Sequence, residues 1–221
     1  MSEMNATIRL RRVKHGYTSG ARSLASRSVT RLARTGVTPN VLTATGVSLC
    51  LAAAVLVPFE NRADQLLVYW LAAGIFVVGS LLDILDGALA RVGGKSTPFG
   101  AFIDSTTDRV GEGAMLAAIA LVFARHGQDW AVVVAVAAVV GSFLVSYTRA
   151  RAEALGLKGD VGLGSRAERV VLITAGLVFA PWGGLPWAIL VLAATAWLTV
   201  VQRVLYVRKQ LSGGTSGIDQ R

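Results

Sequence analysis

LDILDGALARVGGKSTPFGAFIDSTTDR, residues 82–109, decides the fold of this chain. Asp83 and Asp86 lie three residues apart, and Asp104 and Asp108 lie four apart, so on helices each pair shares one face. The Gly-Gly pair and the proline between them predict a short break in the helical pattern. We therefore expect two antiparallel helices whose four carboxylates face each other near the turn.

Four carboxylates at such short range repel one another unless a cation lies among them. Oxygen ligands without a nearby His or Cys suit Mg²⁺, Mn²⁺ or Ca²⁺ better than zinc. The flanks are apolar, FVVGSLL before Asp83 and GAMLAAIALVFA after Glu112. An Asp at the centre of a membrane helix costs about 2.5–3.5 kcal/mol. The clustering therefore favours a metal site over a solvated helix face, which is the commoner explanation in soluble proteins.

The composition indicates a membrane protein. Of the 221 residues, 53% are hydrophobic, and the net charge is +9. Apolar content with this charge predicts an integral membrane protein with basic faces, and basic runs interleaved with aromatics, typical of nucleic-acid binders, are missing. Cys50 is the single cysteine and lies in an apolar run, which excludes a disulfide framework and a zinc site. A long basic stretch precedes the first apolar run, so we expect no cleavable signal peptide.

The chain order predicts one all-α membrane domain over 21–210. Residues 1–20 are expected to be a basic, disordered extension, and Leu and Val alternating with Arg over 21–36 predict an amphipathic interfacial helix. Thr38-Pro39 is a helix start. Six transmembrane helices between 39 and 208 follow, with a short fifth and a flexible tail, 211–221. Their approximate ranges are 39–57, 65–91, 99–124, 130–154, 167–180 and 186–207.

The basic residues predict the orientation. If the six helices alternate in direction, 19 of the 22 Lys and Arg residues fall on one side of the membrane. The loops of the other side contain only Arg62 and Arg125. The positive-inside rule then places both termini and the carboxylates at the cytoplasmic face of the cell (inner) membrane.

The central pattern is Asp83-x2-Asp86-Gly87-x2-Ala90-Arg91-x8-Gly100-x3-Asp104-x3-Asp108. Its small residues let a nucleotide diphosphate approach the helix backbones, and Arg91 suits a phosphate, or else only the positive-inside pattern. The whole pattern resembles the signature of the CDP-alcohol phosphotransferase family.

The resemblance implies transfer of a substituted phosphate from a CDP-linked lipid, CDP-diacylglycerol, to an alcohol, with release of CMP. It implies two Mg²⁺ ions, with Mn²⁺ possible, and a homodimer among membrane lipids. Asp83, Asp86 and Asp104 would hold the metals, and Asp108 would join them and act as general base. The implied contacts to the CDP-lipid are Asn40, Val41, Leu42, Thr43, Gly87, Arg91 and Thr97. For Asn40 and Thr43, capping of the first helix is the alternative.

A second informative segment is SYTRARAEALGLKGDVGLGSRAER, residues 146–169. Its basic residues, Arg149, Arg151, Lys158, Arg166 and Arg169, are dense enough for an anion pocket, although topology signals alone are the alternative. Arg203 could reach the same pocket, or else extend to the membrane interface.

This segment and TVVQR resemble the actinobacterial phosphatidylinositol phosphate synthases. That likeness implies inositol 1-phosphate as the acceptor, bound by Ser146, Arg149, Arg169 and Arg203. Glycerol 3-phosphate, giving phosphatidylglycerophosphate, is the nearest alternative. A divalent-cation transporter is more distant, because nothing charged continues across the membrane. Glu112 is either a support behind the metal ligands or a partner for Arg109.

Overall fold

The computed structural model describes residues 38–92, 97–159, 161–162 and 164–214, and these residues form an all-helical protein. The basic extension and interfacial helix predicted before residue 38 lie outside the described residues. The elements are α2 (Pro39–Leu56), η1 (Val57–Phe59), α3 (Gln65–Val92), α4 (Pro98–Arg125), α5 (Asp129–Ala154), α6 (Arg166–Val178), η2 (Ala180–Trp182) and α7 (Leu185–Gly214). The all-α prediction is therefore confirmed.

The prolines and threonines of the sequence determine where helices begin. Thr38 is the N-cap of α2 with extended backbone, and Pro39 follows in the first turn. Thr97 caps α4 in the same way, and its hydroxyl accepts a hydrogen bond from the Gly100 N–H at 3.0 Å. The last helix differs from its prediction, since α7 continues to Gly214 and includes the first residues of the expected tail.

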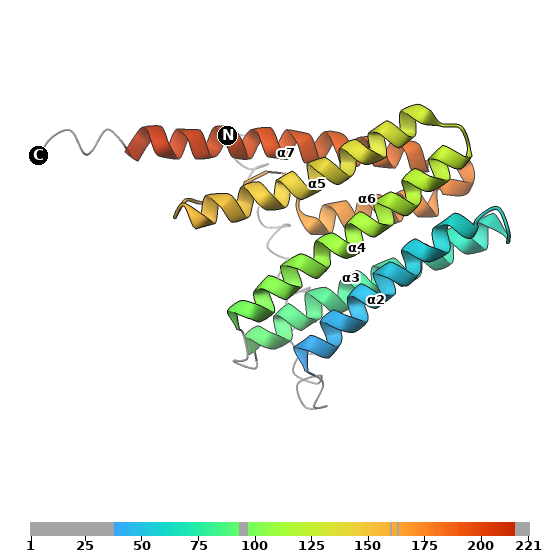
Figure 1. The fold of residues 1–221 in the computed structure, drawn as a ribbon, viewed down its shortest axis with the longest axis horizontal. Helices are drawn as coiled ribbons and strands as arrows, with labels where there is room; N and C mark the ends of the chain where they lie inside the picture. The colour runs from blue at the N-terminus through green and yellow to red at the C-terminus, as the bar shows by residue number, and fades with distance from the viewer. Residues whose placement is uncertain (1–37, 93–96, 160, 163, 215–221) are drawn as a thin grey trace, which may run out of the picture.

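The six helices pack side by side in a closed order, α2–α3–α6–α7–α5–α4 and back to α2. Figure 1 shows α2, α3 and α4 together on one side of the bundle and α7 with α5 on the other. The helices α4 and α5 meet near their connection and diverge toward the opposite end, where α3 ends and α4 begins (Figure 1). The carboxylates of the central pattern lie in that diverging half.

Glycines bring α2 and α3 close together near Asp83. A Cβ atom on Gly46 would lie 2.9 Å from the Gly79 carbonyl oxygen, and one on Gly79 would lie 2.8 Å from the Gly46 carbonyl oxygen. Such contacts between small residues are typical of membrane helices, where backbones approach closely. A Cβ atom on Gly111 of α4 would meet the Cβ of Cys50 at 3.0 Å. The two helices that hold the carboxylates, α3 and α4, are therefore both packed tightly against α2.

Among the residues that the structure describes, four helices are long and apolar enough to cross a membrane: α2 extended by η1, α3 to Gly87, α5, and α7 to Ser212. Helix α4 is as long as α3, but it contains four charged residues before its apolar second half, Asp104, Asp108, Arg109 and Glu112. Helix α6 has 13 residues, so it spans about 20 Å, less than the roughly 30 Å of a bilayer core. That all six helices cross the membrane stays a prediction.

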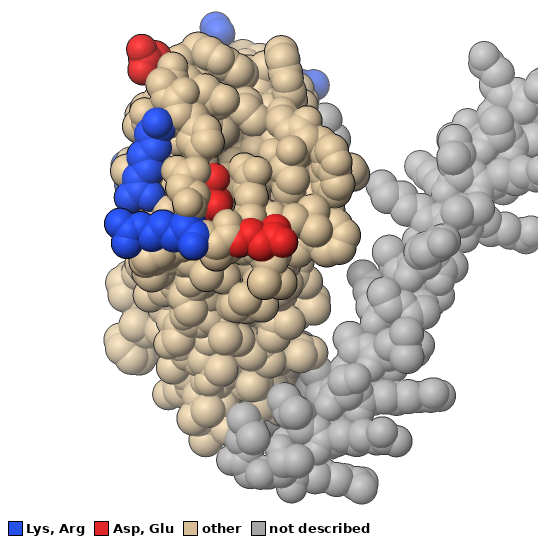
Figure 2. Space-filling model, turned by 90° about the vertical axis from the view of Figure 1, so that its right-hand side faces the viewer, with Lys and Arg blue, Asp and Glu red and all other residues tan. Residues whose placement is uncertain are grey.

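Figure 2 shows the end of the bundle where α2 connects to α3, α4 to α5 and α6 to α7. Most of this surface is neither basic nor acidic, with a small group of charged side chains among the tan ones (Figure 2). In the sequence, the basic residues of these connections are only Arg62 and Arg125. This end of the bundle therefore carries few basic residues, in keeping with the orientation expected from the sequence.

Candidate metal centre and adjoining cavity

Three carboxylates come together where α3 faces α4. Asp83, Asp104 and Asp108 each offer one oxygen, and these oxygens lie within 4.8 Å of one another. Asp83 is buried, and the other two are half-buried. An all-oxygen group of this size suits a hard divalent cation such as Mg²⁺ or Mn²⁺. The sequence predicted that four carboxylates would face one another across the turn, and the structure brings three of them together.

The fourth carboxylate has a different neighbour. Asp86 is 1% exposed, and the Thr43 hydroxyl of α2 lies in hydrogen-bonding contact with its Oδ2. The same hydroxyl lies 3.1 Å from the Pro39 carbonyl oxygen, so its single proton serves one acceptor at a time. Thr43 thus joins the start of α2 to the carboxylate face of α3. Asp86 lies one turn from Asp83, but it is not in the three-carboxylate group.

An arginine from α6 enters the group of carboxylates. The Nη1 of Arg166, the first residue of α6, contacts Asp83 Oδ2 and lies 2.5 Å from Asp108 Oδ1. Its side chain is 27% exposed. The sequence placed Arg166 among the basic residues of a possible anion pocket, but it did not predict the contact with the carboxylates, because nothing local distinguishes Arg166 from the neighbouring arginines.

Arg169, one turn further along α6, is buried against Glu112 of α4. Its Nε donates to Glu112 Oε1 at 2.7 Å, and its Nη2 donates to Oε2 at 2.9 Å. Its Nη1 donates to the Gly164 carbonyl oxygen at 2.8 Å. Glu112 is therefore the partner of Arg169. Arg109, the partner considered from the sequence, instead has its Nη1 on the Ser105 carbonyl oxygen and 3.8 Å from Asp108.

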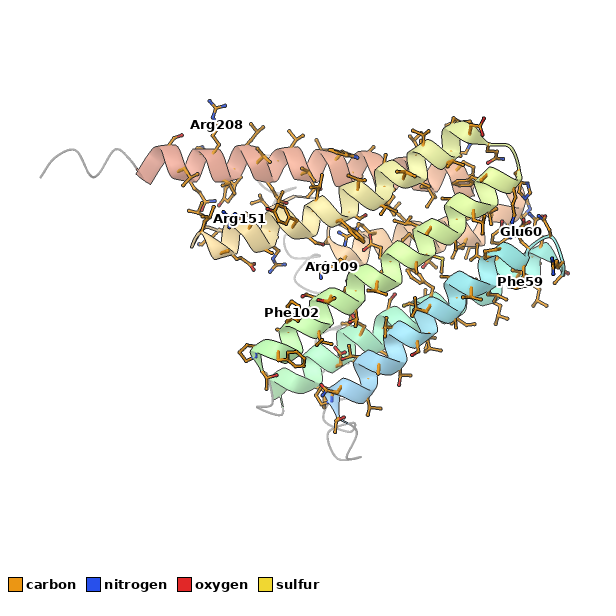
Figure 3. The ribbon with its side chains drawn as sticks, viewed as in Figure 1. Phe59, Glu60, Phe102, Arg109, Arg151 and Arg208 are labelled. Carbon is orange, nitrogen blue, oxygen red and sulfur yellow. The ribbon has the colours of Figure 1, made fainter. Side chains whose placement is uncertain are left out.

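A cavity of about 1120 Å³ lies beside these groups, between the first half of α4, the second half of α5, the start of α6 and Arg203 of α7. It brings together two metal-ligand candidates and the whole predicted acceptor set: Asp104, Asp108, Ser146, Arg149, Arg169 and Arg203. Phe102, Arg109 and Arg166 also line it. Figure 3 shows Phe102 and Arg109 on the α4 side of this half of the bundle, whereas Arg208 points away from it.

The acceptor candidates differ in how they are held. Arg149 is exposed, and its Nε donates to Glu153 Oε1 at 2.8 Å. Arg203 is buried, with its Nε donating to the Val161 carbonyl oxygen at 2.8 Å and its Nη1 contacting the Val145 carbonyl oxygen. The side chain of Arg203 is therefore held by two backbone oxygens, whereas that of Arg149 is held by one exposed ion pair.

One face of α7 holds the backbone of the α5–α6 connection. The contacts are Gly164 N–H to Thr199 Oγ1 (2.8 Å), Arg203 Nε–H to the Val161 carbonyl (2.8 Å), and the Gln210 amide to the Lys158 carbonyl (2.8 Å) and N–H (3.1 Å). The connection thus runs antiparallel to α7 and leads directly into Arg166. Sequence reasoning missed Thr199 and Gln210, because each contacts backbone far away in the chain.

The predicted CDP-lipid residues lie apart from this cavity. Asn40 and Val41 are exposed, Leu42 is buried against Leu89, and Gly87 is half-buried. Thr97 caps α4, and the side chain of Arg91 is outside the described part of the chain. None of the described members of this set lines the cavity. They gather instead where α2 starts, α3 ends and α4 begins, next to the buried Asp86.

Comparison with known proteins identifies relatives of the whole helical region. A family model described as CDP-alcohol phosphatidyltransferase matches residues 36–204. The chain is 41% identical over 193 residues to a phosphatidylinositol phosphate synthase of Mycolicibacterium smegmatis, with 83% of each chain covered. It is 37% identical over 185 residues to an archaetidylinositol phosphate synthase of Pyrococcus horikoshii, covering 83% of this chain and 90% of the relative.

Solved structures agree with these relatives. The Mycobacterium tuberculosis phosphatidylinositol phosphate synthase with CDP-DAG bound has a TM-score of 0.72 and 32% identity, covering 84% of this chain and 94% of that one. The same enzyme in complex with manganese and citrate also has a TM-score of 0.72 and 32% identity, covering 83% and 88%. The fold is thus that of an all-α integral membrane enzyme, and the chain belongs to the CDP-alcohol phosphatidyltransferase family.

Proposed function

We propose that this protein is a phosphatidylinositol phosphate synthase, which transfers the phosphatidyl group from CDP-diacylglycerol to inositol 1-phosphate and releases CMP. The observation that carries the proposal is the cavity in which Asp104 and Asp108 share walls with Ser146, Arg149, Arg169 and Arg203. A carboxylate group beside basic side chains suits an acceptor that has both a reacting hydroxyl and a phosphate of its own. Relatives named as phosphatidylinositol phosphate synthases support the same acceptor.

Mg²⁺ is the proposed cofactor, as two ions, with Mn²⁺ as a substitute. Asp83, Asp104 and Asp108 would hold one ion, because their oxygens already lie within 4.8 Å of one another. Asp86 would contribute to the second ion, together with the pyrophosphate of the substrate. When bound, the ions neutralise charge on the pyrophosphate and on the departing CMP.

Asp108 is the proposed general base. Its side chain is 15% exposed and lies on the cavity wall, where an acceptor hydroxyl can reach it. Asp108 takes the hydroxyl proton while that oxygen forms a bond to the phosphorus that bears diacylglycerol. The bond from this phosphorus to the CMP oxygen breaks, and CMP leaves with the electron pair.

Arg169 is the proposed main anchor for the acceptor phosphate. A guanidinium has five N–H groups, and three of those of Arg169 are used by Glu112 and Gly164, so two remain. Because Glu112 holds the planar group in one orientation, the remaining donors have a defined direction. Ser146, Arg149 and Arg203 supply further donors from α5 and α7.

The CDP-lipid is proposed to enter from the other side of the carboxylates. Asn40, Val41, Leu42, Thr43, Gly87, Arg91 and Thr97 are the residues assigned to it. Six membrane-crossing helices, an interfacial helix before them, a cytoplasmic active site in the inner membrane and a homodimer complete the proposal. The basic residues of the sequence support this orientation.

CMP release by the purified protein with CDP-diacylglycerol and Mg²⁺ tests the function. Inositol 1-phosphate, glycerol 3-phosphate, free inositol and serine are offered separately. We expect release with inositol 1-phosphate, weakened by Arg169→Ala. Release with glycerol 3-phosphate alone would keep the reaction and replace the acceptor. Divalent-cation flux into liposomes without CMP release from any acceptor would overturn the enzyme in favour of a transporter.

A further inference from the structure

We propose that the Arg166 side chain and the divalent cation compete for the same carboxylates, so that cation binding releases Arg166 into the acceptor cavity. This inference rests on the proposed metal centre. Arg166 Nη1 contacts Asp83 Oδ2 and lies 2.5 Å from Asp108 Oδ1. Both residues belong to the three-carboxylate group. Because the Arg166 guanidinium bridges two of these carboxylates, a metal ion held by the same carboxylates would lie close to it, and two cations at such short range repel each other.

Charge explains why an arginine takes this position. Carboxylates on facing helices repel one another, and a buried carboxylate without a counter-charge is costly. Arg166 supplies one positive charge and bridges α3 to α4, since Asp83 and Asp108 come from different helices. A divalent cation brings twice that charge to the same oxygens. Mutual repulsion then favours departure of the guanidinium.

The backbone around Arg166 is anchored, so only its side chain has to move. Ser165 is the N-cap of α6 in a capping box with Glu168. Gly164 is held by the Thr199 hydroxyl at 2.8 Å and by Arg169 at 2.8 Å. Rotation about the flexible side-chain bonds of Arg166 is therefore the low-cost response.

The released side chain has a place to go. Arg166 lines both the large cavity and a small pocket formed with Asp83, Asp108 and Glu112. Turning from the pocket into the cavity brings the guanidinium of Arg166 to those of Arg149, Arg169 and Arg203. Cation binding would thus prepare the acceptor site, and by linkage an acceptor phosphate that holds Arg166 in the cavity would favour cation binding.

Mn²⁺ binding to the full-length protein in detergent micelles, followed by the electron paramagnetic resonance signal of free Mn²⁺, tests the competition. Arg166→Gln removes the competitor and should tighten Mn²⁺ binding, by about 5- to 150-fold if the coupling has the usual size. Arg109→Gln is the matched control. It removes the same charge near Asp108, from 3.8 Å, but Arg109 does not bridge the carboxylates. Its effect on Mn²⁺ affinity should be small.

Thermal melting provides the second measurement. Without added Mn²⁺, Arg166→Gln should melt at a lower temperature than the wild type, and Mn²⁺ should raise its melting temperature by more. If Arg166→Gln does not fold, Arg166→Lys carries the test, because one ammonium bridges two carboxylates less well and should tighten Mn²⁺ binding to a smaller extent.

The outcomes separate this inference from the proposed function. Equal or weaker Mn²⁺ binding in Arg166→Gln, with binding intact in the wild type, would overturn the competition and leave the metal centre in place. No Mn²⁺ binding in either protein would overturn both the metal centre and the competition. CMP release with inositol 1-phosphate judges the proposed function independently of either result.

Discussion

Glu112 of α4 and Arg169 of α6 form a bidentate ion pair inside the protein, with Nε–Oε1 and Nη2–Oε2 distances of 2.7 and 2.9 Å. Their side chains are 8% and 6% exposed, so neither charge is well solvated. The two helices are not consecutive in the chain, because α5 lies between them, and the ion pair joins residues that are 57 positions apart. Arg169 in turn holds Gly164 at the end of the α5–α6 connection.

Glu112→Ala should therefore destabilise the protein strongly. Removing one partner of a buried pair leaves an uncompensated charge, which costs about 3–5 kcal/mol. Glu112→Gln keeps the shape and one acceptor oxygen and should cost less. Thermal melting in detergent measures both changes.

Glu112→Gln should also raise the KM for inositol 1-phosphate more than it lowers kcat, because a misoriented Arg169 holds the acceptor less well. A variant that lost stability with an unchanged KM would limit Glu112 to a structural role. The KM of Arg149→Gln for inositol 1-phosphate serves as a comparison, because Arg149 is exposed and pairs with Glu153, so its orientation does not depend on Glu112.

Asp108→Asn should abolish turnover while CDP-diacylglycerol still binds. A positioned general base contributes about 10²–10⁴-fold to a rate, and Asp108 also belongs to the carboxylate group. CMP release and CDP-lipid binding are measured in parallel, both with Mg²⁺. Asp64→Asn is the control, because Asp64 caps α3 in the connection from η1, at the end of the bundle away from the cavity. Unchanged turnover in Asp108→Asn would remove Asp108 from the role of base.

Local sequence rules predicted the helices and most of the carboxylate group. Thr38-Pro39 was predicted as a helix start for reasons contained in a few neighbouring residues, and the same local rule, not applied to Thr97-Pro98 from the sequence, explains the start of α4. The spacing of three residues likewise predicted that Asp83 and Asp86 share one face of a helix. The spacing of four residues predicted the same for Asp104 and Asp108 on the next helix. Such rules say which side chains share a face, and they are reliable because the α-helix has a fixed period.

The contacts between helices could not be predicted in this way. Asp86 shares a face with Asp83, yet its neighbour Thr43 lies 43 positions away, and Arg166 reaches Asp83 across 83 positions. Separations of this size along the chain leave no periodic pattern in the sequence. The pair of Glu112 and Arg169 had one usable signal, because Glu112 stands at the edge of a long apolar run. A buried glutamate needs a cation, and the cation could have been sought among the basic residues of 146–169.

Gly79→Ala should separate α2 from α3 and disturb the carboxylates. The added Cβ would lie 2.8 Å from the Gly46 carbonyl oxygen and 2.9 Å from Cys50 Sγ, so the helices have to shift. Overpacking of this kind costs about 1–3 kcal/mol. Gly74→Ala on the same helix is the matched control, since its Cβ meets nothing within 4 Å. Melting temperature and Mn²⁺ affinity should fall in Gly79→Ala only. Equal behaviour of the two variants would contradict the close packing of α2 on α3.

Gly162→Ala should weaken acceptor binding by displacing the α5–α6 connection from α7. Gly162 has φ +114°, and its added Cβ would lie 2.4 Å from Thr199 Cγ2, a side chain that is fully buried. Gly156→Ala, in the same connection, is the control. Its φ of +71° also penalises alanine, but nothing lies within 4 Å of the added atom.

Both variants place alanine at a positive φ, but only Gly162→Ala adds a clash, so the difference between them combines the larger strain at φ +114° with the contact to Thr199. We expect Gly162→Ala to raise the KM for inositol 1-phosphate well above that of Gly156→Ala, because Gly164 and Arg166 follow the displaced backbone. CDP-diacylglycerol binding should stay the same in both, since its assigned residues lie at the other side of the carboxylates. A KM that rose equally in the two variants would show that strain alone, without the contact to α7, governs the acceptor site.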